Sequence, residues 1–418
     1  MDAGMRHLML LVSTTGYTGD AFLEAARALG VPTLVGSDRC HVLSEAWPLE
    51  GRVTLDFRHP DEAVRQLVEA SRQRPIGAIV ATSETTARIA SLAGERLGLR
   101  HNASSATEAA ANKRIMRELL ERAGVPAPRA RVFSIESDPD DLTGEIAFPC
   151  VLKPLLLSAS RGVIRADDSH EFRAAFSRIA ALLRAPDLLE LDPVDAKNIL
   201  VEPFVPGPEV AVEGLLVPNE PFRVLAIFDK PDPLDGPFFE ETIYVTPSRL
   251  PEPRLVEISQ VTEAAARAMG LSDGPVHAEL RVGPNGVQVI EVAARTIGGL
   301  CSRALRFGTK TTLEEIVIRH AMGLPVASTE REGSAAGAMM IPIPRAGILV
   351  EVGGIDAAKA IRGIEDVVIT ALERRLVPLP EGKAYLGFIF ARGETPADVE
   401  QALRAAHRCL EYQIRPAL

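Results

Sequence analysis

The sequence has no apolar run near the roughly 20 residues that a helix needs to cross a bilayer. The apolar stretch within residues 1–12 is short, lacks a charged start and runs into a Ser-Thr-Thr-Gly turn, which predicts a first buried strand rather than a signal peptide. Basic residues are not in excess either, because the formal charge is -10 and acids and bases are interspersed. This balance offers no basic face for nucleic acid and no polybasic membrane anchor. We therefore expect small-molecule partners, with neither nucleic acid nor membrane among them.

Cysteines are also few, and the four present have neither the spacing of a metal site nor that of a redox motif: Cys40, Cys150, Cys301 and Cys409. Widely separated cysteines of this kind are typical of reduced thiols in a cytoplasmic protein. Only Cys301 lies near the residues singled out below. A packing role is favoured there over a catalytic thiol, because an unactivated cysteine is usually buried.

The 418 residues are enough for two or three domains, and a hydrophobic content of 46% supports sizeable cores. The first hundred residues alternate between strand and helix patterns, which predicts a Rossmann-like domain with a boundary near residue 105. The expected strands are 7–12, 31–35 and 76–81, and the expected helices are 20–29, 61–74 and 84–97.

A true G-x-G-x-x-G motif is missing from the first strand-to-helix turn, at residues 13–19. The turn still lies after a strand and before a helix, where parallel sheets place ligand groups. A phosphate site is therefore the weaker hypothesis, and a substrate-facing or purely structural turn is favoured.

Two alternating segments, 276–282 and 287–292, flank a Gly-Pro-Asn-Gly sequence, which is typical of a β-hairpin. We expect a three-residue loop that pairs Gly283 with Val287 and so puts Glu279 opposite Glu291. Carboxylates in that position, with Cβ atoms roughly 5 Å apart, repel each other unless a cation or proton lies between them. A hard ion such as Mg²⁺ would remove the repulsion. The alternatives are a solvated hairpin, or one whose register slips at a bulge.

Charged residues also end or follow several apolar segments in the middle of the chain. Lys153 ends an apolar strand and, if buried, needs an anion, either a structural acid or a ligand phosphate. The small-residue loop at 157–163 reads as a hairpin turn or as a lid whose amides and hydroxyls cover phosphates. Glu202 follows the apolar residues 199–201 within the segment 198–205, and Glu209 follows a Pro-Gly-Pro turn.

The order of these parts resembles the ATP-grasp superfamily: Lys113 after a linker, the Phe-Pro-Cys-Val-Leu-Lys-Pro strand, the Ser-Ala-Ser-Arg-Gly-Val loop, Val-Glu-Pro-Phe-Val-Pro-Gly-Pro-Glu, and Ala-Glu-Leu paired with Glu-Val-Ala-Ala-Arg. The resemblance covers roughly residues 108–325. The segments 339–345 and 385–392 are similar to the carboxy-terminal domain of L-amino-acid ligases.

The resemblance implies an α/β and α+β protein with three domains. These would be a Rossmann-like preATP-grasp domain at 1–105, an ATP-grasp domain at 106–328 made of two α+β subdomains that clasp ATP, with its lid at about 126–205, and a small α+β domain at 329–418. The implied cofactors are ATP and Mg²⁺, for which Mn²⁺ can substitute.

The resemblance also implies roles for individual residues. Those implied to bind ATP are Lys113, Lys153, the lid residues Ser158, Ser160, Arg161 and Gly162, the adenine hinge Glu202, Phe204 and Val205, and the ribose-binding Glu209. Glu279 and Glu291 would hold the metal, and Arg295 would join Lys153 in catalysis at the γ-phosphate. For Arg295 the alternative is a salt bridge to one of those two acids. The substrate side would involve His277, Gly298, Gly299 and Arg303, although His277 also fits a structural role and Arg303 a surface charge.

One position departs from the family pattern. Ala293 stands where many members have an asparagine that completes a second Mg²⁺ site, so a second ion would rely on Glu291, phosphate and water or bind more weakly. The resemblance implies a carboxylate-amine ligase that forms an amide through an acyl phosphate. Two alternatives stay open: an enzyme using another nucleophile or a carboxylase-type acid, and a non-catalytic nucleotide-binding protein. A homodimer is the simplest assembly, although the sequence does not indicate one.

Overall fold

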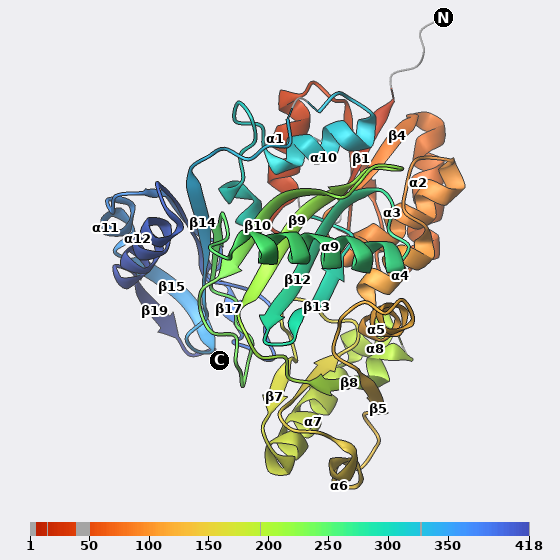
Figure 1. The fold of residues 1–418 in the computed structure, drawn as a ribbon. Helices are drawn as coiled ribbons and strands as arrows, with labels where there is room; N and C mark the ends of the chain where they lie inside the picture. The colour runs from red at the N-terminus through yellow and green to blue at the C-terminus, as the bar shows by residue number, and fades with distance from the viewer. Residues whose placement is uncertain (1–5, 15, 39–50, 193, 327, 418) are drawn as a thin grey trace, which may run out of the picture.

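The computed structural model describes residues 6–14, 16–38, 51–192, 194–326 and 328–417, in four sheets with helices on their faces (Figure 1). The first sheet is parallel, with strand order β3-β2-β1-β4. Its strands are β1 (His7–Val12), β2 (Thr33–Ser37), β3 (Arg52–Thr54) and β4 (Ile76–Ala81), and its helices are α1 (Gly19–Ala28), α2 (Pro60–Gln73) and α3 (Glu84–Leu97).

These elements confirm the Rossmann-like start that the alternating pattern predicts. The bounds of β4 and α3 agree with the sequence prediction, because clear signals stand at both ends of α3. Ser83 accepts from the backbone N–H of Thr86 in a capping box, and Gly98 ends the helix in the left-handed conformation, with φ of 63°. Of the turn predicted at 13–19, Thr15 lies outside the described residues, as does Cys40.

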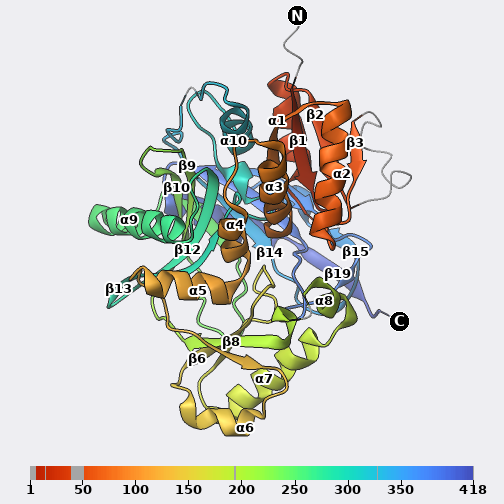
Figure 2. The ribbon, with the colours of Figure 1, turned by 90° about the vertical axis from the view of Figure 1, so that its right-hand side faces the viewer.

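The helices α4 (Ser104–Ala111) and α5 (Lys113–Arg122) connect this domain to a small antiparallel sheet. That sheet has the order β5-β8-β6-β7, from β5 (Arg131–Ser134), β6 (Cys150–Pro154), β7 (Ile164–Ala166) and β8 (Asn198–Pro203). Its helices are α6 (Pro139–Leu142), α7 (Ser169–Leu183) and α8 (Pro186–Leu191). We call this unit the lid subdomain, and it lies apart from the first sheet in both ribbon views (Figures 1 and 2).

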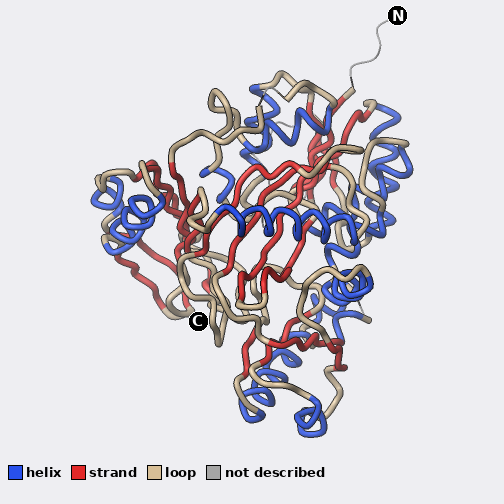
Figure 3. The backbone as a smooth tube through the Cα atoms, viewed as in Figure 1, coloured by secondary structure: helices blue, strands red, loops and turns tan. Residues whose placement is uncertain are grey.

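The largest sheet has eight strands in the order β13-β12-β9-β10-β11-β14-β18-β16, with every neighbouring pair antiparallel. Five strands precede residue 328: β9 (Glu209–Leu216), β10 (Arg223–Lys230), β11 (Ile243–Thr246), β12 (Gly274–Gly283) and β13 (Gly286–Ala293). Three follow it: β14 (Ala335–Ile341), β16 (Ile364–Ile369) and β18 (Gly387–Gly393). The helix α9 (Glu252–Ala268) crosses the face of the first group, and α10 (Leu313–Met322) packs against α1 and β4 (Figures 1 and 3).

The carboxy-terminal part adds a three-stranded sheet of order β17-β15-β19, from β15 (Gly347–Gly353), β17 (Arg375–Leu376) and β19 (Glu411–Arg415). Its helices are α11 (Ile355–Lys359) and α12 (Pro396–Arg408), and α12 packs on β14 and β18.

The pairing of β11 with β14 carries the large sheet across residue 328 without a break. One core cluster joins Leu8 of β1, Phe228 of β10, Ile316 of α10 and Phe388 of β18, so the first and last parts of the chain bury their apolar faces together. The domain boundaries drawn from the sequence remain predictions. Among the described residues, no helix combines the length and apolar character that crossing a membrane requires.

Candidate active site

The hairpin of β12 and β13 places Glu279 directly opposite Glu291, as predicted, but by a different route. The loop has two residues rather than three, since Gly283 pairs with Gly286 and not with Val287. A register shift next to Glu279 then leaves Ile290 without a partner on β12, which restores the pairing of the two acids. The predicted loop was wrong, but the predicted position of Glu279 opposite Glu291 is confirmed. The shorter loop and the bulge each displace the register by one residue, in opposite directions, so the two displacements cancel.

A lysine stands beside each of the two carboxylates. The Nζ atom of Lys230 lies 3.4 Å from Oε2 of Glu279, and that of Lys113 lies 3.3 Å from Oε1 of Glu291. Burial raises the pKa of Glu279, Lys230 opposes this, and the carboxylates of Glu209 and Glu291 add to the rise. The repulsion expected from sequence is thus moderated by two ammonium groups.

Lys230 is itself surrounded by acids. Its Nζ atom lies 2.7 Å from Oε1 of Glu209 and also donates to Glu241. Carboxylate oxygens of Glu209, Glu241 and Glu279 lie within 4.8 Å of one another. Carboxylate oxygens are the ligands that Mg²⁺ accepts beside phosphate oxygens, so the donor chemistry of Glu279, and of Glu291 opposite it on the hairpin, fits the implied metal.

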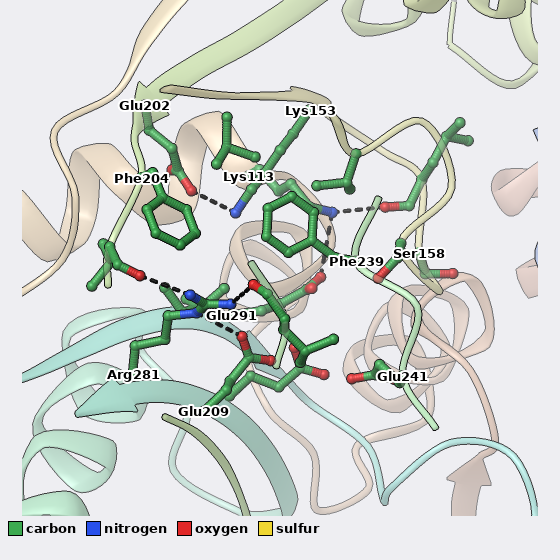
Figure 4. Close-up of a pocket in the computed structure, with 18 of the residues that line it drawn as sticks. Lys113, Lys153, Ser158, Glu202, Phe204, Glu209, Phe239, Glu241, Arg281 and Glu291 are labelled. Atoms are coloured by element: carbon green, nitrogen blue, oxygen red, sulfur yellow. Dashed lines mark hydrogen bonds and ion pairs between the residues drawn. The ribbon is translucent and has the colours of Figure 1, made fainter. Parts of the chain in front are cut away.

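A cavity lies between the lid subdomain and the hairpin, and we call it the first cavity (Figure 4). Lys113, Lys153 and the acids Glu209, Glu279 and Glu291 all line it, and Figure 4 shows the two lysines across the cavity from Glu209. Nearly all the residues that the sequence predicts for nucleotide binding line it as well: Lys113, Lys153, Ser158, Ser160, Glu202, Phe204, Val205 and Glu209. The structure therefore brings these residues together, although their individual roles remain predictions.

Lys153 finds its anion in Glu202. The two side chains are 2.5 Å apart, and Arg117 from α5 also approaches Glu202, with Nε 2.9 Å from Oε2. Burial acts to raise the pKa of Glu202, but Arg117 and Lys153 outweigh it and hold the pKa below its usual value. The Glu202 carboxylate is therefore already paired with two cations. A contact with adenine at this position would be made by the backbone.

Arg281 of β12 organises the opposite wall of the first cavity. Its Nε donates to Oε2 of Glu209 at 2.9 Å, and its Nη1 donates to the carbonyl of Val205 at 2.8 Å. Its guanidinium also lies 5.0 Å from the ring centroid of Phe204. Lys230 and Arg281 together hold the pKa of Glu209 below its usual value against the opposing effect of burial. A ribose contact by Glu209 would therefore share this carboxylate with both cations.

A second, larger cavity opens where the first sheet, the hairpin and the carboxy-terminal strands meet. From the predicted substrate side, His277, Gly298 and Gly299 line it, and so do Ser13, Thr14, Gly16, Tyr17 and Thr18 of the first turn. The first turn thus faces this cavity, which agrees with the substrate-facing interpretation of it. Residues that line both cavities are Ser158, Ser160, Glu241, Glu279 and Glu291.

Arg295 lines the second cavity but is not free there. Its Nε donates to Oε1 of Glu84 at 2.8 Å, from the first turn of α3. Arg295 outweighs the effect of burial and lowers the pKa of Glu84. The salt bridge to Glu279 or Glu291, weighed as the alternative for Arg295, is replaced by one to an acid more than 200 positions away.

The side chain of His277 is held by a hydrogen bond to the buried Glu213. Its Nδ1 lies 3.1 Å from Oε2 of Glu213, which also accepts from the backbone N–H of Ile297 at 3.0 Å. Glu213 is fully buried, and burial raises its pKa. The ring of His277 is therefore fixed in orientation, with Nε2 3.7 Å from Oε1 of Glu279.

Two predicted residues point elsewhere. Arg303 pairs with Asp366 at 2.9 Å, stacks over Phe390 and lines neither cavity, so the structure does not bring it together with the other predicted substrate residues, and its substrate role stays a prediction. Arg161 directs its Nε to the carbonyl of Glu381 rather than into the first cavity. Cys301 is buried, and burial raises the pKa of its thiol, which agrees with packing rather than catalysis.

Sequence reasoning missed several charged residues of the site: Glu84, Arg117, Lys230, Glu241 and Arg281. Lys230 carries a readable signal, since it ends an apolar strand as Lys153 does. Arg281 shares a strand face with Glu279, so its position was also accessible. The partners of Arg117 and Glu84 have no local signal, because their contacts depend on the fold.

Comparison with known families gives three matches along the chain: an ATP-grasp N-terminal domain at residues 23–101, an ATP-grasp domain at 146–304 and an L-amino acid ligase C-terminal domain 2 at 339–415. The chain is 25% identical to an uncharacterised protein, y4rH, of Sinorhizobium fredii, over 99% of this chain and 84% of that protein. It is 29% identical to an alanine–anticapsin ligase of Bacillus subtilis over 58% of this chain, a match that spans 56% of that ligase.

Among solved structures, the L-amino acid ligase from Bacillus licheniformis superposes with a TM-score of 0.84 at 24% identity, covering 98% of this chain and 99% of that one. The chain belongs to the ATP-grasp superfamily. Within it, the carboxy-terminal part is similar to a domain of the L-amino acid ligases, and relatives that match the chain include ligases that join amino acids.

The buried pairing of Arg117 with Glu202 leads to a stability prediction. Arg117→Leu removes both guanidinium contacts to Glu202 and the bond from Nη2 to the Ile290 carbonyl, which is 2.7 Å long. Glu202 is only 3% exposed, so we expect a loss of about 3–5 kcal/mol in the free energy of unfolding. Chemical denaturation of the free protein measures it. Arg122→Leu is the control: it changes an exposed arginine in the last turn of the same helix, and an equal loss there would contradict the prediction.

The pH dependence gives the same prediction a second readout. The folded pKa of Glu202 lies below its ordinary value of 4.5. Its contribution to stability is therefore complete above that value and is lost as the pH falls through the folded pKa. We expect the difference between wild type and Arg117→Leu to shrink on acidification below the ordinary value.

Proposed function

We propose that this chain is an ATP-dependent ligase that joins a carboxylic acid to an amine. The carboxylate oxygen attacks the γ-phosphorus of ATP and ADP leaves, which gives an acyl phosphate. The amine nitrogen then attacks the acyl carbon, loses a proton and releases inorganic phosphate, which leaves an amide or peptide bond. Both substrates are small molecules.

The observation that carries this proposal is the position of Glu279 and Glu291, which line both cavities. The first cavity has the lysines and the hinge expected for a nucleotide, and the second has the glycines and the first-domain turn expected for organic substrates. Phosphoryl transfer needs the attacking oxygen close to the γ-phosphate and in line with the leaving group. Two cavities that meet at the two carboxylates supply that arrangement.

The cations of the site would neutralise the charge of the triphosphate. Lys113 and Lys153 line the first cavity, where the ammonium group of Lys113 pairs with Glu291 and that of Lys153 pairs with Glu202. Arg295 reaches the second cavity from the end of the same hairpin, so its guanidinium would face the charge that develops between the two substrates. Held by Glu84, it needs little reorganisation when the reaction occurs.

Mg²⁺ bound by Glu279 and Glu291 would draw charge from the phosphate oxygens. The lid loop, residues 158–163, supplies Ser158 and Ser160 to both cavities, so it would cover the reacting groups. Water must be kept out because it hydrolyses an acyl phosphate. His277, Gly298 and Gly299 would contact the organic substrates. The oriented ring of His277 offers one hydrogen-bonding nitrogen, and the two glycines permit a close approach to the backbone.

The proposed function predicts that ADP release depends on two organic substrates together. ATP and Mg²⁺ are incubated with the protein and a matrix of amino acids and small carboxylic acids, and ADP, phosphate and condensed products are measured. We expect at least one pair to give ADP and amide in equal amounts, because the acyl phosphate should form and then transfer to the amine. ADP release with no dependence on any acid, or ATP binding with no turnover across a broad matrix, would contradict the ligase proposal.

A further inference from the structure

The segment 377–385 runs from β17 to β18, and we call it the strap. Two of its backbone carbonyls accept hydrogen bonds from the lid loop. The N–H of Gly162 donates to the carbonyl of Pro380 at 2.7 Å, and Nε of Arg161 donates to the carbonyl of Glu381 at 2.9 Å. The lid loop is therefore closed onto the carboxy-terminal part of the chain, which explains why Arg161 points away from the first cavity.

A bidentate ion pair fastens the strap to the body of the lid subdomain. Nε of Arg178 on α7 lies 2.6 Å from Oε1 of Glu381, and Nη2 lies 2.9 Å from Oε2. The Arg178 guanidinium also lies over the ring of Phe238, with 5.2 Å to the centroid. Two parallel bonds fix the direction as well as the distance between strap and lid, which a single contact would not do.

The lid loop has a backbone that needs outside support. Ala159 and Ser160 have φ of 56° and 54°, in the left-handed region that residues with a Cβ atom rarely adopt. Such conformations persist where surrounding contacts hold them. Gly162, with φ of 74°, follows them, and a Cβ there would lie 2.6 Å from Cγ of Pro154. The contacts with the strap lie directly beside this strained stretch.

The other end of the strap belongs to the second cavity. Lys383, Ala384 and Tyr385 line that cavity, and the backbone N–H of Tyr385 lies 3.4 Å from the hydroxyl of Tyr17 in the first-domain turn. Within a few residues the strap thus contacts the lid over the first cavity and forms a wall of the second. Because Glu381 is only two residues before Lys383, a shift of the backbone at Lys383–Tyr385 on substrate binding would also move Glu381.

We propose that the strap couples occupation of the substrate cavity to closure of the lid, with Glu381 as the positioning residue and Arg178 as its partner. This rests on the proposed function, because it assigns the substrate to the second cavity and the nucleotide to the first. Binding in either cavity favours the closed arrangement, so each substrate strengthens the binding of the other. Closure also keeps water from the acyl phosphate.

The first test needs no turnover. Hydrogen exchange is measured for peptides that cover residues 156–164 in the wild type, Glu381→Ala and Arg178→Ala, alone and with Mg²⁺ and a non-hydrolysable ATP analogue. Both partners are partly exposed, with side chains 41% and 47% accessible, so we expect exchange about two- to fivefold faster in either variant. Arg173→Ala is the matched control, since Arg173 lies on the same helix and pairs with Asp140, away from the strap.

The second test reads the reaction. In Glu381→Ala we expect a higher KM for ATP, a smaller change in kcat, and more ADP released per amide formed, because a looser lid admits water. The charge-swapped double variant, Arg178→Glu with Glu381→Arg, restores the ion pair with its charges reversed. It should recover most of the lost protection from hydrogen exchange and most of the coupling. If the single variants only destabilised the fold, the charge-swapped double variant would not recover this protection.

The outcomes separate this proposal from the ligase activity. Unchanged lid exchange in both single variants, or no recovery in the charge-swapped double variant, overturns the role of the strap even if the enzyme is an active ligase. Faster lid exchange that recovers in the charge-swapped double variant supports the coupling contact. If every acid and amine then fails to give product, the ligase proposal fails while the contact between strap and lid stands.

Discussion

Replacing Glu291 with glutamine is expected to lower substrate-dependent ADP release by about a thousandfold, which corresponds to roughly 4 kcal/mol of transition-state stabilisation. Glutamine keeps the size of the side chain and one oxygen but loses the negative charge. Glu291 lies at the junction of both cavities and faces Glu279, so its charge is needed where a metal and the triphosphate would meet. Steady-state ADP release with a saturating substrate pair measures the effect.

Two comparisons make the Glu291→Gln result specific. Glu394→Gln changes an exposed acid ahead of α12 that lines neither cavity and should leave the rate within about twofold, since isolated surface charges contribute little. Raising the Mg²⁺ concentration should recover part of the activity if the lost charge serves the metal. A Glu291→Gln protein with wild-type activity at low Mg²⁺ would remove the hairpin acids from the proposed mechanism.

The second large effect is expected at Lys153. Lys153→Met removes an ammonium from the first cavity and should weaken ATP binding about a hundredfold, since a charged contact to phosphate is worth roughly 2–3 kcal/mol. Its partner Glu202 keeps the bidentate contact with Arg117, so the protein should remain folded. Calorimetric titration with a non-hydrolysable ATP analogue and Mg²⁺ measures binding, and thermal unfolding checks the fold.

Lys153→Met and Arg117→Leu form an informative pair because both cations contact the same carboxylate. Lys153 lines the first cavity and Arg117 does not. We expect the lysine change to lower nucleotide affinity with a smaller loss of stability than the arginine change, because Arg117 contacts Glu202 through two nitrogens and also bonds the Ile290 carbonyl. If both variants lost affinity and stability equally, Lys153 would act only as a structural partner of Glu202. It would then have no separate role at the phosphates.

Much of the fold was predictable because local signals define it. The strand at 76–81 and the helix at 84–97 are bounded by a capping box and a left-handed glycine, which act within a few residues. Lys153 was predictable for a similar reason, since a charge at the end of a buried strand must be met by an anion. The identity of that anion, Glu202, was not, because it lies on a strand almost 50 residues later.

The hairpin shows how a correct pairing can follow from an incorrect local model. The Pro-Asn-Gly sequence suggests a three-residue loop, yet the chain forms a two-residue loop and places the extra residue at Ile290. The bulge also aims the Ile290 carbonyl at Arg117, a contact between residues 173 positions apart. Sequence periodicity constrains which faces meet but cannot choose between a loop and a bulge when tertiary contacts decide.

The partner of Arg295 and the place of Arg303 were out of reach for the same reason. The Arg295 contact joins the segment after β13 to the first turn of α3, and the Arg303 contact reaches Asp366 on β16. Both depend on how the sheets are assembled rather than on their own segments. Lys230 is different, because the strand-end signal used for Lys153 was present and was not applied to it.

The unbroken ladder from β11 into β14 means that the carboxy-terminal part is not an interchangeable module. A chain cut near residue 328 would leave β11 as a bare strand edge with the apolar side chains of Ile243 and Val245, a surface that recruits other chains instead of ending the sheet cleanly. Met340 of β14 lines the second cavity within that same ladder. Under the proposed function, altering the range of accepted substrates would be a matter of single positions along the wall of the second cavity, and grafting a relative's carboxy-terminal part would have to preserve the strand pairing at Ile243–Thr246.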